Sequence, residues 1–398
     1  MNILYYIPYI SKEDGGIYQY SLAVLESLKN NLENNYYIFH LKSNTEIEEI
    51  VKNHKNLFLV GRGKTKENLF FFFLRNFLKT LFVVFQTLKI NIKIKQISTI
   101  RHLLKKYDID IIHSPFQAIP ENCNIPLIST MHDVQELHFP EFFTPKQRIQ
   151  RSMNAKLIIE NSDAVIVSYD HIKKDIVKLF NKPDSKVHVV FENLSDFWFN
   201  KFLNKKIKYE LPKGINPYEF ILYPAATWEH KNHLNLIKAI KKLKSKGINT
   251  QLICTGTKTS FYYKIKEIVI SENLENDIHF IGIVTDKQLF DLYTNSLGVV
   301  IPTLYEAGSY ILMESILLNV PVICSNVTSL PETMNNNEYI FNPFDINDIS
   351  AKLELLLTNN EYRKNSIQNS ISVKHNIMKN DLAFKFNNIY KEIMGYYH

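Results

Sequence analysis

The segment 297–325 most constrains the fold, because it reads as two buried strands joined by a helix. Residues 297–303, LGVVIPT, are apolar and rich in β-branched side chains, which is typical of a strand buried in a parallel sheet. Residues 310–319, YILMESILLN, have the length and apolar content of a helix, and Ser309 is a candidate N-cap. Residues 320–325, VPVICS, then predict a second strand. A strand–loop–helix–strand unit of this kind indicates an α/β fold.

Two glutamates, Glu306 and Glu314, lie on this otherwise apolar unit. If Glu306 closes the strand and Glu314 lies inside the helix, eight helical steps separate them by roughly 12 Å. They would then hold two parts of one elongated ligand. The helix start near Ser309 presents backbone N–H groups that attract phosphate, so sugar, diphosphate and ribose fit the layout. The alternative is that Glu306 is a solvated loop carboxylate and Glu314 lies on the exposed side of the helix.

Length and composition indicate a two-domain globular protein. A chain of 398 residues is too long for one typical hydrophobic core, and 45% hydrophobic with 22% charged residues is ordinary for a globular protein. The net charge of +7 is modest over this length and does not indicate nucleic-acid binding. The three cysteines, Cys123, Cys254 and Cys324, form no C-x-x-C pair, so we expect reduced core residues and neither a disulfide nor a zinc site.

No signal peptide is visible, because Met1 leads directly into the apolar run NILYYIP. The best candidate for a membrane span, residues 69–90, is interrupted by charged and polar side chains and is rejected. We therefore expect a cytoplasmic protein. Segment 69–107 carries eight Lys and Arg residues and no acidic one. It predicts either basic amphipathic helices lying peripherally on the inner face of an anionic membrane, or a helix hairpin packed on the first sheet.

Three further motifs lie where predicted strands end. Gly15 and Gly16 form a strand-to-helix turn that lets backbone approach a ligand, although the pattern is not G-x-G-x-x-G. His132 ends the predicted strand PLISTMHDV, a place where a lone histidine is more often structural. Lys231 precedes a helix predicted to begin near Asn232, where an ammonium and helix N–H groups could bind a diphosphate.

The run from Glu306 to Glu332 resembles the retaining glycosyltransferases of family 4. Their C-terminal domains carry two glutamates separated by seven residues and then a VPV strand followed by S-N-x-x-S-L-P-E, and this chain has VPVICSNVTSLPE at 320–332. The Gly-Gly turn, the strand ending in His-Asp, and an Arg-Lys-Asn element, here His230-Lys231-Asn232, extend the resemblance. The chain departs in the loop 307–311, which reads AGSYI where the family commonly has Gly-Phe-Gly-Leu-Pro.

This resemblance implies the GT-B fold, an α/β architecture of two facing doubly wound, Rossmann-like domains with a deep interdomain cleft. The implied organisation is an N-terminal acceptor-side domain at 1–196, a linker at 197–217, a C-terminal nucleotide-sugar-binding domain at 218–376, and a final helix at 377–398 that crosses back to the first domain.

The implied reaction is retaining transfer of a hexose, mannose-like or other, from a nucleotide-diphosphate sugar to a glycan or lipid-linked glycan, in bacterial surface polysaccharide synthesis. Neither a metal nor a cofactor is implied. The catalytic candidates are His132, Lys231 and Glu306. The candidates for donor binding are Gly15, Gly16, His230, Lys231, Gly256, Val284, Leu289, Glu306, Gly308, Ser309, Tyr310, Ile311 and Glu314. Two alternatives stay open: a GT-B sugar-nucleotide epimerase, and an inactive binding or partner subunit of the same fold.

Overall fold

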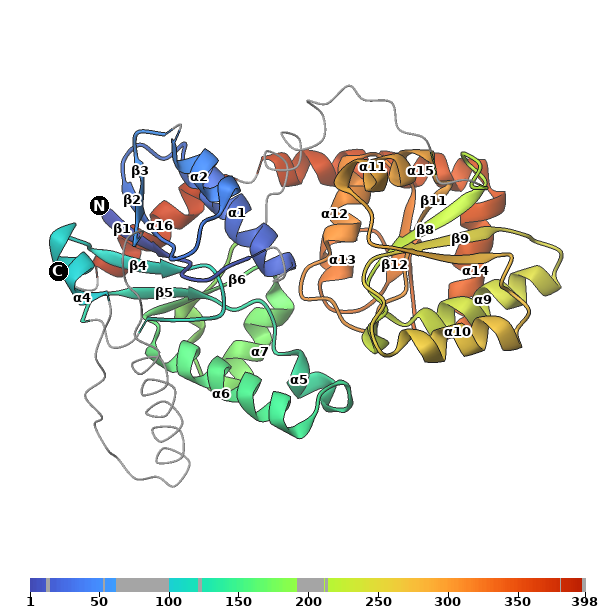
Figure 1. Ribbon diagram of the computed structural model, residues 1–398, viewed down its shortest axis with the longest axis horizontal. Coiled ribbons are helices and arrows are strands. Elements are labelled where there is room, and N and C mark those ends of the chain that lie inside the picture. Colours follow the sequence, from blue (N-terminus) through green and yellow to red (C-terminus); the bar gives the residue numbers. More distant parts are fainter. Residues whose placement is uncertain are drawn as a thin grey trace. The chain divides into compact units, whose positions relative to one another are not determined.

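The computed structural model divides into two units, each of which is described by itself (Figure 1). Unit 1 comprises Met1–Phe191 and Leu382–His398, and unit 2 comprises Glu192–Asp381. The structure describes residues 1–11, 15–52, 54–61, 100–120, 124–191, 211, 214–379 and 381–395. Cys123, most of the predicted linker 197–217 and most of the basic segment 69–107 lie outside these ranges.

Unit 1 is built on a parallel seven-stranded sheet in the order β3-β2-β1-β4-β5-β6-β7. The order reverses direction between β1 and β4, as in a doubly wound sheet. The strands are β1 (Asn2–Tyr6), β2 (Asn35–Phe39), β3 (Leu57–Val60), β4 (Ile111–Ser114), β5 (Leu127–Thr130), β6 (Ala164–Val167) and β7 (Val187–Val189).

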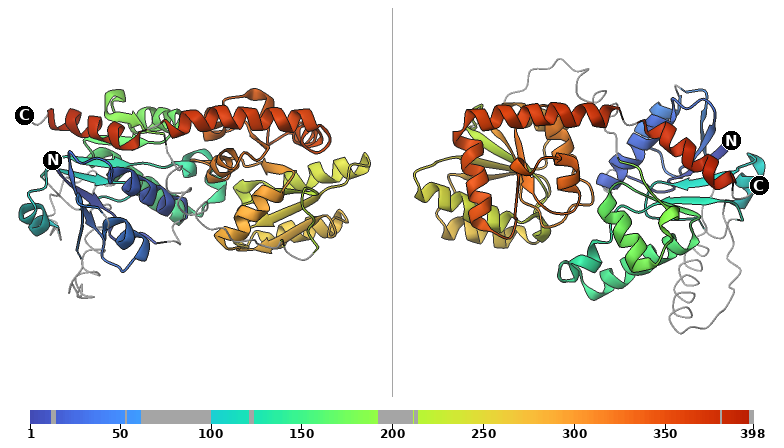
Figure 2. Two further views of the ribbon diagram at one scale, coloured as in Figure 1. Left: turned by 90° about the horizontal axis from the view of Figure 1, so that it is seen from above. Right: turned by 180° about the vertical axis from the view of Figure 1, so that it is seen from behind.

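Helices cover both faces of this sheet, as Figures 1 and 2 show. One face carries α1, α2 and α16, and the other carries α6 and α7. The α-helices are α1 (Gly16–Leu28), α2 (Thr45–Lys52), α4 (Arg101–Lys106), α5 (Gln135–His138), α6 (Pro145–Asn161), α7 (Asp170–Phe180) and α16 (Leu382–Gly395), with short 3-10 turns η2 (Pro140–Phe142) and η3 (Asp184–Lys186).

The last helix, α16, is tied to unit 1 by buried polar contacts. The ring of His113, fully buried on β4, lies with Nδ1 2.7 Å from the hydroxyl of Tyr390. Asn387 accepts a hydrogen bond from Asn34 at 2.8 Å. Burial lowers the pKa of His113 to about 3, so the ring is neutral at physiological pH. The two ends of the chain therefore belong to one folded unit.

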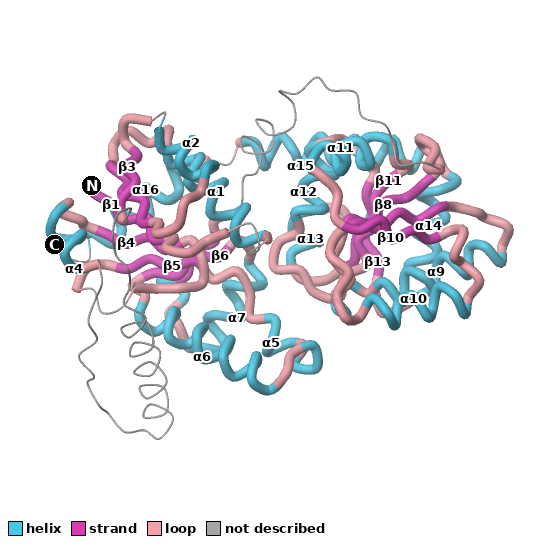
Figure 3. Tube along the Cα trace, viewed as in Figure 1, coloured by secondary structure: helices cyan, strands magenta, loops and turns pink. Residues whose placement is uncertain are grey.

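Unit 2 has a parallel six-stranded sheet in the order β10-β9-β8-β11-β12-β13, again with one reversal, between β8 and β11. Figure 3 shows these strands enclosed by helices. The strands are β8 (Phe220–Pro224), β9 (Gln251–Thr255), β10 (Ile278–Gly282), β11 (Gly298–Ile301), β12 (Val322–Ser325) and β13 (Ile340–Phe341).

Two groups of helices pack around this sheet. Helices α9, α10 and α14 pack together, and α12, α13 and α15 form a second group. The α-helices are α9 (His233–Ser245), α10 (Tyr262–Ser271), α11 (Asp286–Asn295), α12 (Tyr310–Leu317), α13 (Ser329–Met334), α14 (Ile346–Thr358) and α15 (Asn360–Met378), with 3-10 turns η4 (Glu229–Lys231) and η5 (Asn337–Tyr339).

The unit predicted at 297–325 is confirmed as β11, α12 and β12, with β11 and β12 parallel. Ser309 caps α12, because its hydroxyl accepts the N–H of Leu312 at 3.3 Å. β11 ends at Ile301, so Glu306 lies in the following loop and the condition that it closes the strand is not met. Pro302 explains where the strand ends, since it has no N–H for the β ladder.

The interior of each sheet is apolar. All four residues of β6, β11 and β12 are buried, as expected for strands covered on both faces. Cys254 and Cys324 are free and buried in β9 and β12, as predicted. Within the described ranges, no helix combines the length and apolar composition needed to cross a bilayer.

The contact between His113 and Tyr390 predicts a measurable contribution of α16 to stability. Tyr390→Phe removes the hydroxyl and leaves His113 Nδ1 buried without this partner, so we expect a loss of about 1–3 kcal/mol of unfolding free energy. Urea unfolding of unit 1, followed through hydrogen exchange of β1 and β4 amides, measures it. Lys391→Ala, an exposed change on the same helix, is the matched control and should leave stability unchanged. Equal stabilities of the two variants would contradict the interpretation.

Candidate functional site

The candidate site of unit 2 lies at the reversal point of its sheet. Strands β8 and β11 are parallel neighbours there, so the loops that leave their carboxyl ends meet at one edge. Lys231 follows β8, and Glu306 follows β11. In open α/β sheets ligands bind outside the carboxyl ends of the strands at this point.

Lys231 and Glu306 form an ion pair between the two loops. Lys231 Nζ lies 2.5 Å from Glu306 Oε1, and their side chains are 16% and 9% exposed. In a buried pair of this kind each charge offsets part of the desolvation cost of the other, and removal of one partner leaves an unpaired charge. Glu306 is therefore not a solvated loop carboxylate, which excludes that alternative for it.

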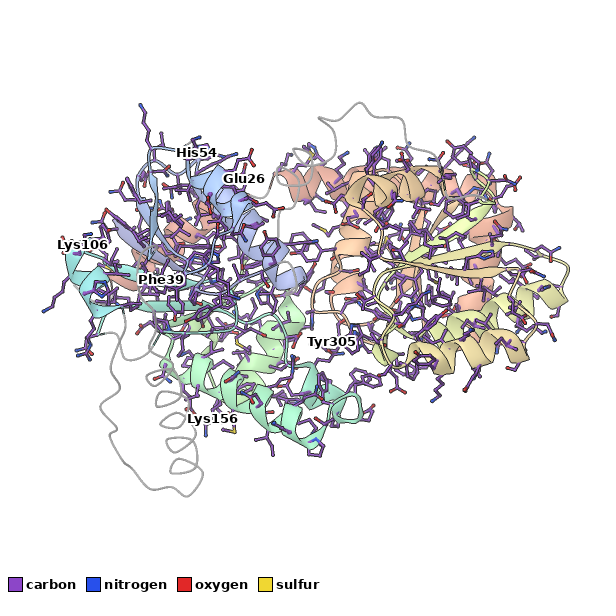
Figure 4. The ribbon with its side chains drawn as sticks, in the orientation of Figure 1. Glu26, Phe39, His54, Lys106, Lys156 and Tyr305 are labelled. Carbon is purple, nitrogen blue, oxygen red and sulfur yellow. The ribbon has the colours of Figure 1, made fainter. Side chains whose placement is uncertain are left out.

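Both loops are held by hydrogen bonds that fix the pair. The carbonyl of His230 accepts the N–H of Leu304 at 2.8 Å and the hydroxyl of Thr303 at 3.1 Å. The hydroxyl of Tyr223, on β8, donates to the carbonyl of Lys231 at 2.8 Å. Tyr305, labelled in Figure 4, is buried in the loop that leads to Glu306. The site is thus largely pre-formed.

Asn232 joins the Lys231 turn to the rest of unit 2. Its backbone is left-handed, with φ 59°, a conformation that asparagine tolerates better than most residues. Its side-chain amide donates to the carbonyls of Pro302 and Pro343 at 2.8 and 2.9 Å. The helix predicted near Asn232 begins at His233, with Asn232 as its N-cap residue.

Glu314 lies inside α12 and is buried, not on the exposed side of the helix. Its Oε2 accepts the hydroxyl of Tyr293, which lies on α11, at 2.7 Å. Burial and the nearby carboxylate raise the pKa of Tyr293 well above its usual value, so the phenol remains a donor. Sequence reasoning missed Tyr293, because 21 residues separate it from Glu314 and no motif links them.

The two histidines beside Lys231 are neutral in the folded unit. Burial, with a smaller effect from the Lys231 charge, lowers the pKa of His230 and of His233 to about 3. The ring of His233 packs 4.8 Å from the ring of Tyr223 and 5.8 Å from that of Phe280. Among the described residues neither ring nitrogen of His233 has a hydrogen-bond partner.

The remaining donor-binding candidates of unit 2 lie in loops and in the first turns of helices that follow its strands. Gly256 has φ 100°, and a Cβ there would come within 2.9 Å of the backbone nitrogen of Ala226, so glycine is required for this close approach. Val284 and Leu289 are partly buried around the start of α11. Gly308, Ser309, Tyr310 and Ile311 form the end of the Glu306 loop and the first turn of α12.

In unit 1, Gly15 and Gly16 begin α1 in the loop that follows β1. Gly15 has φ 57° and ψ −120°, a conformation that glycine adopts readily. His132 lies two residues beyond β5 and is buried. Its Nε2 lies 2.9 Å from the carbonyl of Pro115, and burial lowers the pKa of the ring, so a neutral ring donates this bond.

Arg151 was not singled out from sequence, yet it anchors the loop that carries His132. Its Nε donates to Glu136, which is buried, at 2.9 Å, and its Nη2 also pairs with Asp133. The guanidinium lies 5.1 Å from the ring of Phe143. The arginine comes from α6, 18 residues beyond Asp133, so only the fold brings the three together.

A metal site does not emerge from the parts of the chain that the structure describes. No group of three or more His, Cys, Asp or Glu side chains is arranged there to hold an ion. His230 and His233, whose spacing could suit a metal on a helix, lie in η4 and at the first position of α9.

Two family profiles match the chain. The profile "Glycosyl transferases group 1" matches residues 208–373, and "Glycosyltransferase Family 4" matches residues 63–191. "O-antigen chain mannosyltransferase B" of Escherichia coli is 26% identical over 270 residues, 66% of this chain and 68% of that protein. "O-antigen chain mannosyltransferase RfbU" of Salmonella typhimurium is 25% identical over 225 residues, 56% of this chain and only 59% of its own length.

Solved structures share the whole fold at low sequence identity. A glycosyltransferase from Rickettsia africae is 18% identical, with a TM-score of 0.66 over 99% of this chain and 98% of its own. Sucrose-phosphate synthase from Thermosynechococcus elongatus is 17% identical, with a TM-score of 0.67 over 99% of each chain. HepE of Anabaena, in complex with UDP and glucose, is 12% identical, with a TM-score of 0.64 over 99% of this chain and 100% of its own. The predicted GT-B fold of two Rossmann-like domains is confirmed.

The buried histidines predict that unit 2 loses stability in acid. Between pH about 6.5 and about 3 the unfolded chain binds protons at His230 and His233 that the folded unit does not bind. Stability is therefore full above pH about 6.5 and falls by about 1 kcal/mol per pH unit for each histidine as the pH decreases. His233→Phe should remove one of the two contributions and make the slope shallower.

Hydrogen exchange of β8 and β9 amides at pH 7 and pH 5, corrected for the intrinsic rates, measures this slope within unit 2. His375→Gln, at an exposed position of α15, is the matched control and should keep the slope of the unchanged protein. A His233→Phe slope identical to that of the control would show that His233 does not titrate as inferred.

Proposed function

Because the chain belongs to the group 1 and family 4 glycosyltransferases, we propose that it transfers a hexose from a nucleotide-diphosphate sugar to a glycan or lipid-linked glycan acceptor with retention of configuration. The observation that carries the proposal is the Lys231–Glu306 pair at the reversal point of the unit 2 sheet. Two relatives are O-antigen mannosyltransferases, which supports bacterial surface polysaccharide synthesis and a mannose-like donor sugar.

Lys231 acts on the leaving group in this proposal. The bond between the anomeric carbon and the diphosphate oxygen breaks, and negative charge develops on that oxygen. An ammonium and the N-terminal end of α12, both fixed in advance, stabilise this charge without reorganisation. The neutral His230 adds no positive charge of its own, so Lys231 carries the electrostatic part of the site.

Glu306 and Glu314 hold two ends of the donor. When Lys231 turns to the diphosphate, the Glu306 carboxylate becomes available to accept hydrogen bonds from hydroxyls of the donor sugar. Glu314 accepts ribose hydroxyls, with Tyr293 fixing the orientation of its carboxylate. We also assign His132 of unit 1 to donor binding; its ring is held by the carbonyl of Pro115, and Arg151 anchors its loop through Asp133 and Glu136.

No protein nucleophile or metal is part of this mechanism. The acceptor hydroxyl attacks the anomeric carbon from the face that the diphosphate leaves, and its proton passes to the departing phosphate oxygen. This route retains configuration with residues that bind and orient, and it differs from a glycosidase pair of carboxylates flanking the bond. Peripheral membrane contact through 69–107, which would suit a lipid-linked acceptor, belongs to the same proposal.

Three substitutions test the assigned roles. Lys231→Ala, Glu306→Gln and Glu314→Gln should each lower transfer, Lys231→Ala by about a hundredfold or more in kcat because it removes charge stabilisation in the transition state. Glu314→Gln should act mainly on the donor KM. Transfer assays with circular dichroism and melting curves measure activity and folding together. Lys241→Ala, which removes a surface ion pair on α9, is the matched control. Full activity of a folded variant would remove that residue from the site.

The donor is identified by a panel of nucleotide sugars. We expect one class of nucleotide sugar to raise the melting temperature of the protein, and a mannosyl donor is the leading candidate. The same donor should then support transfer to a glycan acceptor. Transfer should persist after exhaustive chelation. If the protein binds no nucleotide sugar of the panel, the proposed function is refuted. Transfer that depends on a metal would refute the mechanism. Turnover of the sugar nucleotide without an acceptor would indicate an epimerase.

A further inference from the structure

Thr328 adopts a backbone conformation that its side chain disfavours. It precedes α13 with φ 49° and ψ −118°. A β-branched residue at positive φ is a genuine outlier. The other non-glycine residues with positive φ in the described ranges are asparagines, one aspartate and one tyrosine, so Thr328 is the β-branched exception there.

Gly15 shows which residue would suit this conformation. It stands before α1 with φ 57° and ψ −120°, nearly the same angles as Thr328. Glycine reaches these angles without a Cβ clash. At the turn before α13 the chain nonetheless keeps a threonine, which points to a use of its side chain that outweighs the strain.

That use is visible in the hydrogen bonds of Glu306. The hydroxyl of Thr328 accepts the N–H of Glu306 at 3.0 Å, and the hydroxyl of Ser329 donates to the carbonyl of Glu306 at 3.2 Å. Both backbone groups of Glu306 are thus held by two successive residues at the start of α13. From this backbone the carboxylate reaches Lys231 Nζ at 2.5 Å.

We propose that Thr328 is a positioning residue whose hydroxyl fixes the Glu306 carboxylate where it meets the donor sugar, and that the strained backbone at 328 is retained for this purpose. The inference rests on the proposed function, in which Glu306 binds sugar hydroxyls. It assigns no chemical step to Thr328 itself, because the residue acts only through the backbone of Glu306.

Three variants separate the effect of the Thr328 hydroxyl from the effect of the backbone strain. Thr328→Gly relieves the strain and removes the hydroxyl, Thr328→Ala removes the hydroxyl alone, and Thr328→Ser keeps it. We expect Thr328→Gly to melt at or above the temperature of the unchanged protein while kcat falls by about ten- to a hundredfold, the size of effect that a small misplacement of a site group produces. Thr328→Ser should restore most of the activity.

Asn335→Gly is the matched control, because it relieves a positive φ of 51° at the other end of α13, at an exposed position. It should leave transfer unchanged. Equal kcat values for Thr328→Gly and the unchanged protein would overturn the inference while the proposed function stands. If the glycine variant fails to fold, equal activities of the alanine and serine variants would overturn it. Failure of the unchanged protein to bind any nucleotide sugar would overturn both.

Discussion

The pairing of β8 with β11 is the constraint on which the unit 2 site depends. It brings Lys231 and Glu306, 75 residues apart in sequence, to within 2.5 Å. Their loops meet because parallel strands end at the same edge of the sheet. There the two opposite charges pair with each other while largely shielded from water. A ligand that takes Lys231 from Glu306 must offer comparable negative charge, which favours a diphosphate over a neutral sugar.

Backbone hydrogen bonds do much of the positioning in this site. The carbonyls of His230 and Lys231, and both backbone groups of Glu306, are held by side chains or by the facing loop. Such contacts fix the backbone from which a side chain extends, and they leave the charged group at its tip free to exchange partners. This arrangement suits a site whose charged groups must be placed in advance and still be released to a substrate.

Local signals in the sequence were sufficient to predict the helices and strands, and insufficient to predict the contacts between them. Apolar runs and a capping serine predicted β11, α12 and β12, and the family pattern drew attention to Lys231, Glu306 and Glu314. Pro302, which has no N–H for the β ladder, accounts for the end of β11 at Ile301. Other contacts arise only in the tertiary structure and cannot be predicted from sequence spacing. They are the Tyr293–Glu314 hydrogen bond, the pairing of Arg151 with Asp133 and Glu136, and the strained turn at Thr328.

The membership of α16 in unit 1 has a consequence for how the protein is made. A ribosome completes Glu192–Asp381 before it synthesises Leu382 and the residues after it, so unit 2 has its whole sequence while unit 1 still lacks a helix. Until that helix arrives, the buried ring of His113 and the side chain of Asn34 have no Tyr390 or Asn387 to meet. The unit whose first residues are translated earliest therefore cannot complete its fold until the last helix has been synthesised, whereas domains generally fold in N-terminal-first order.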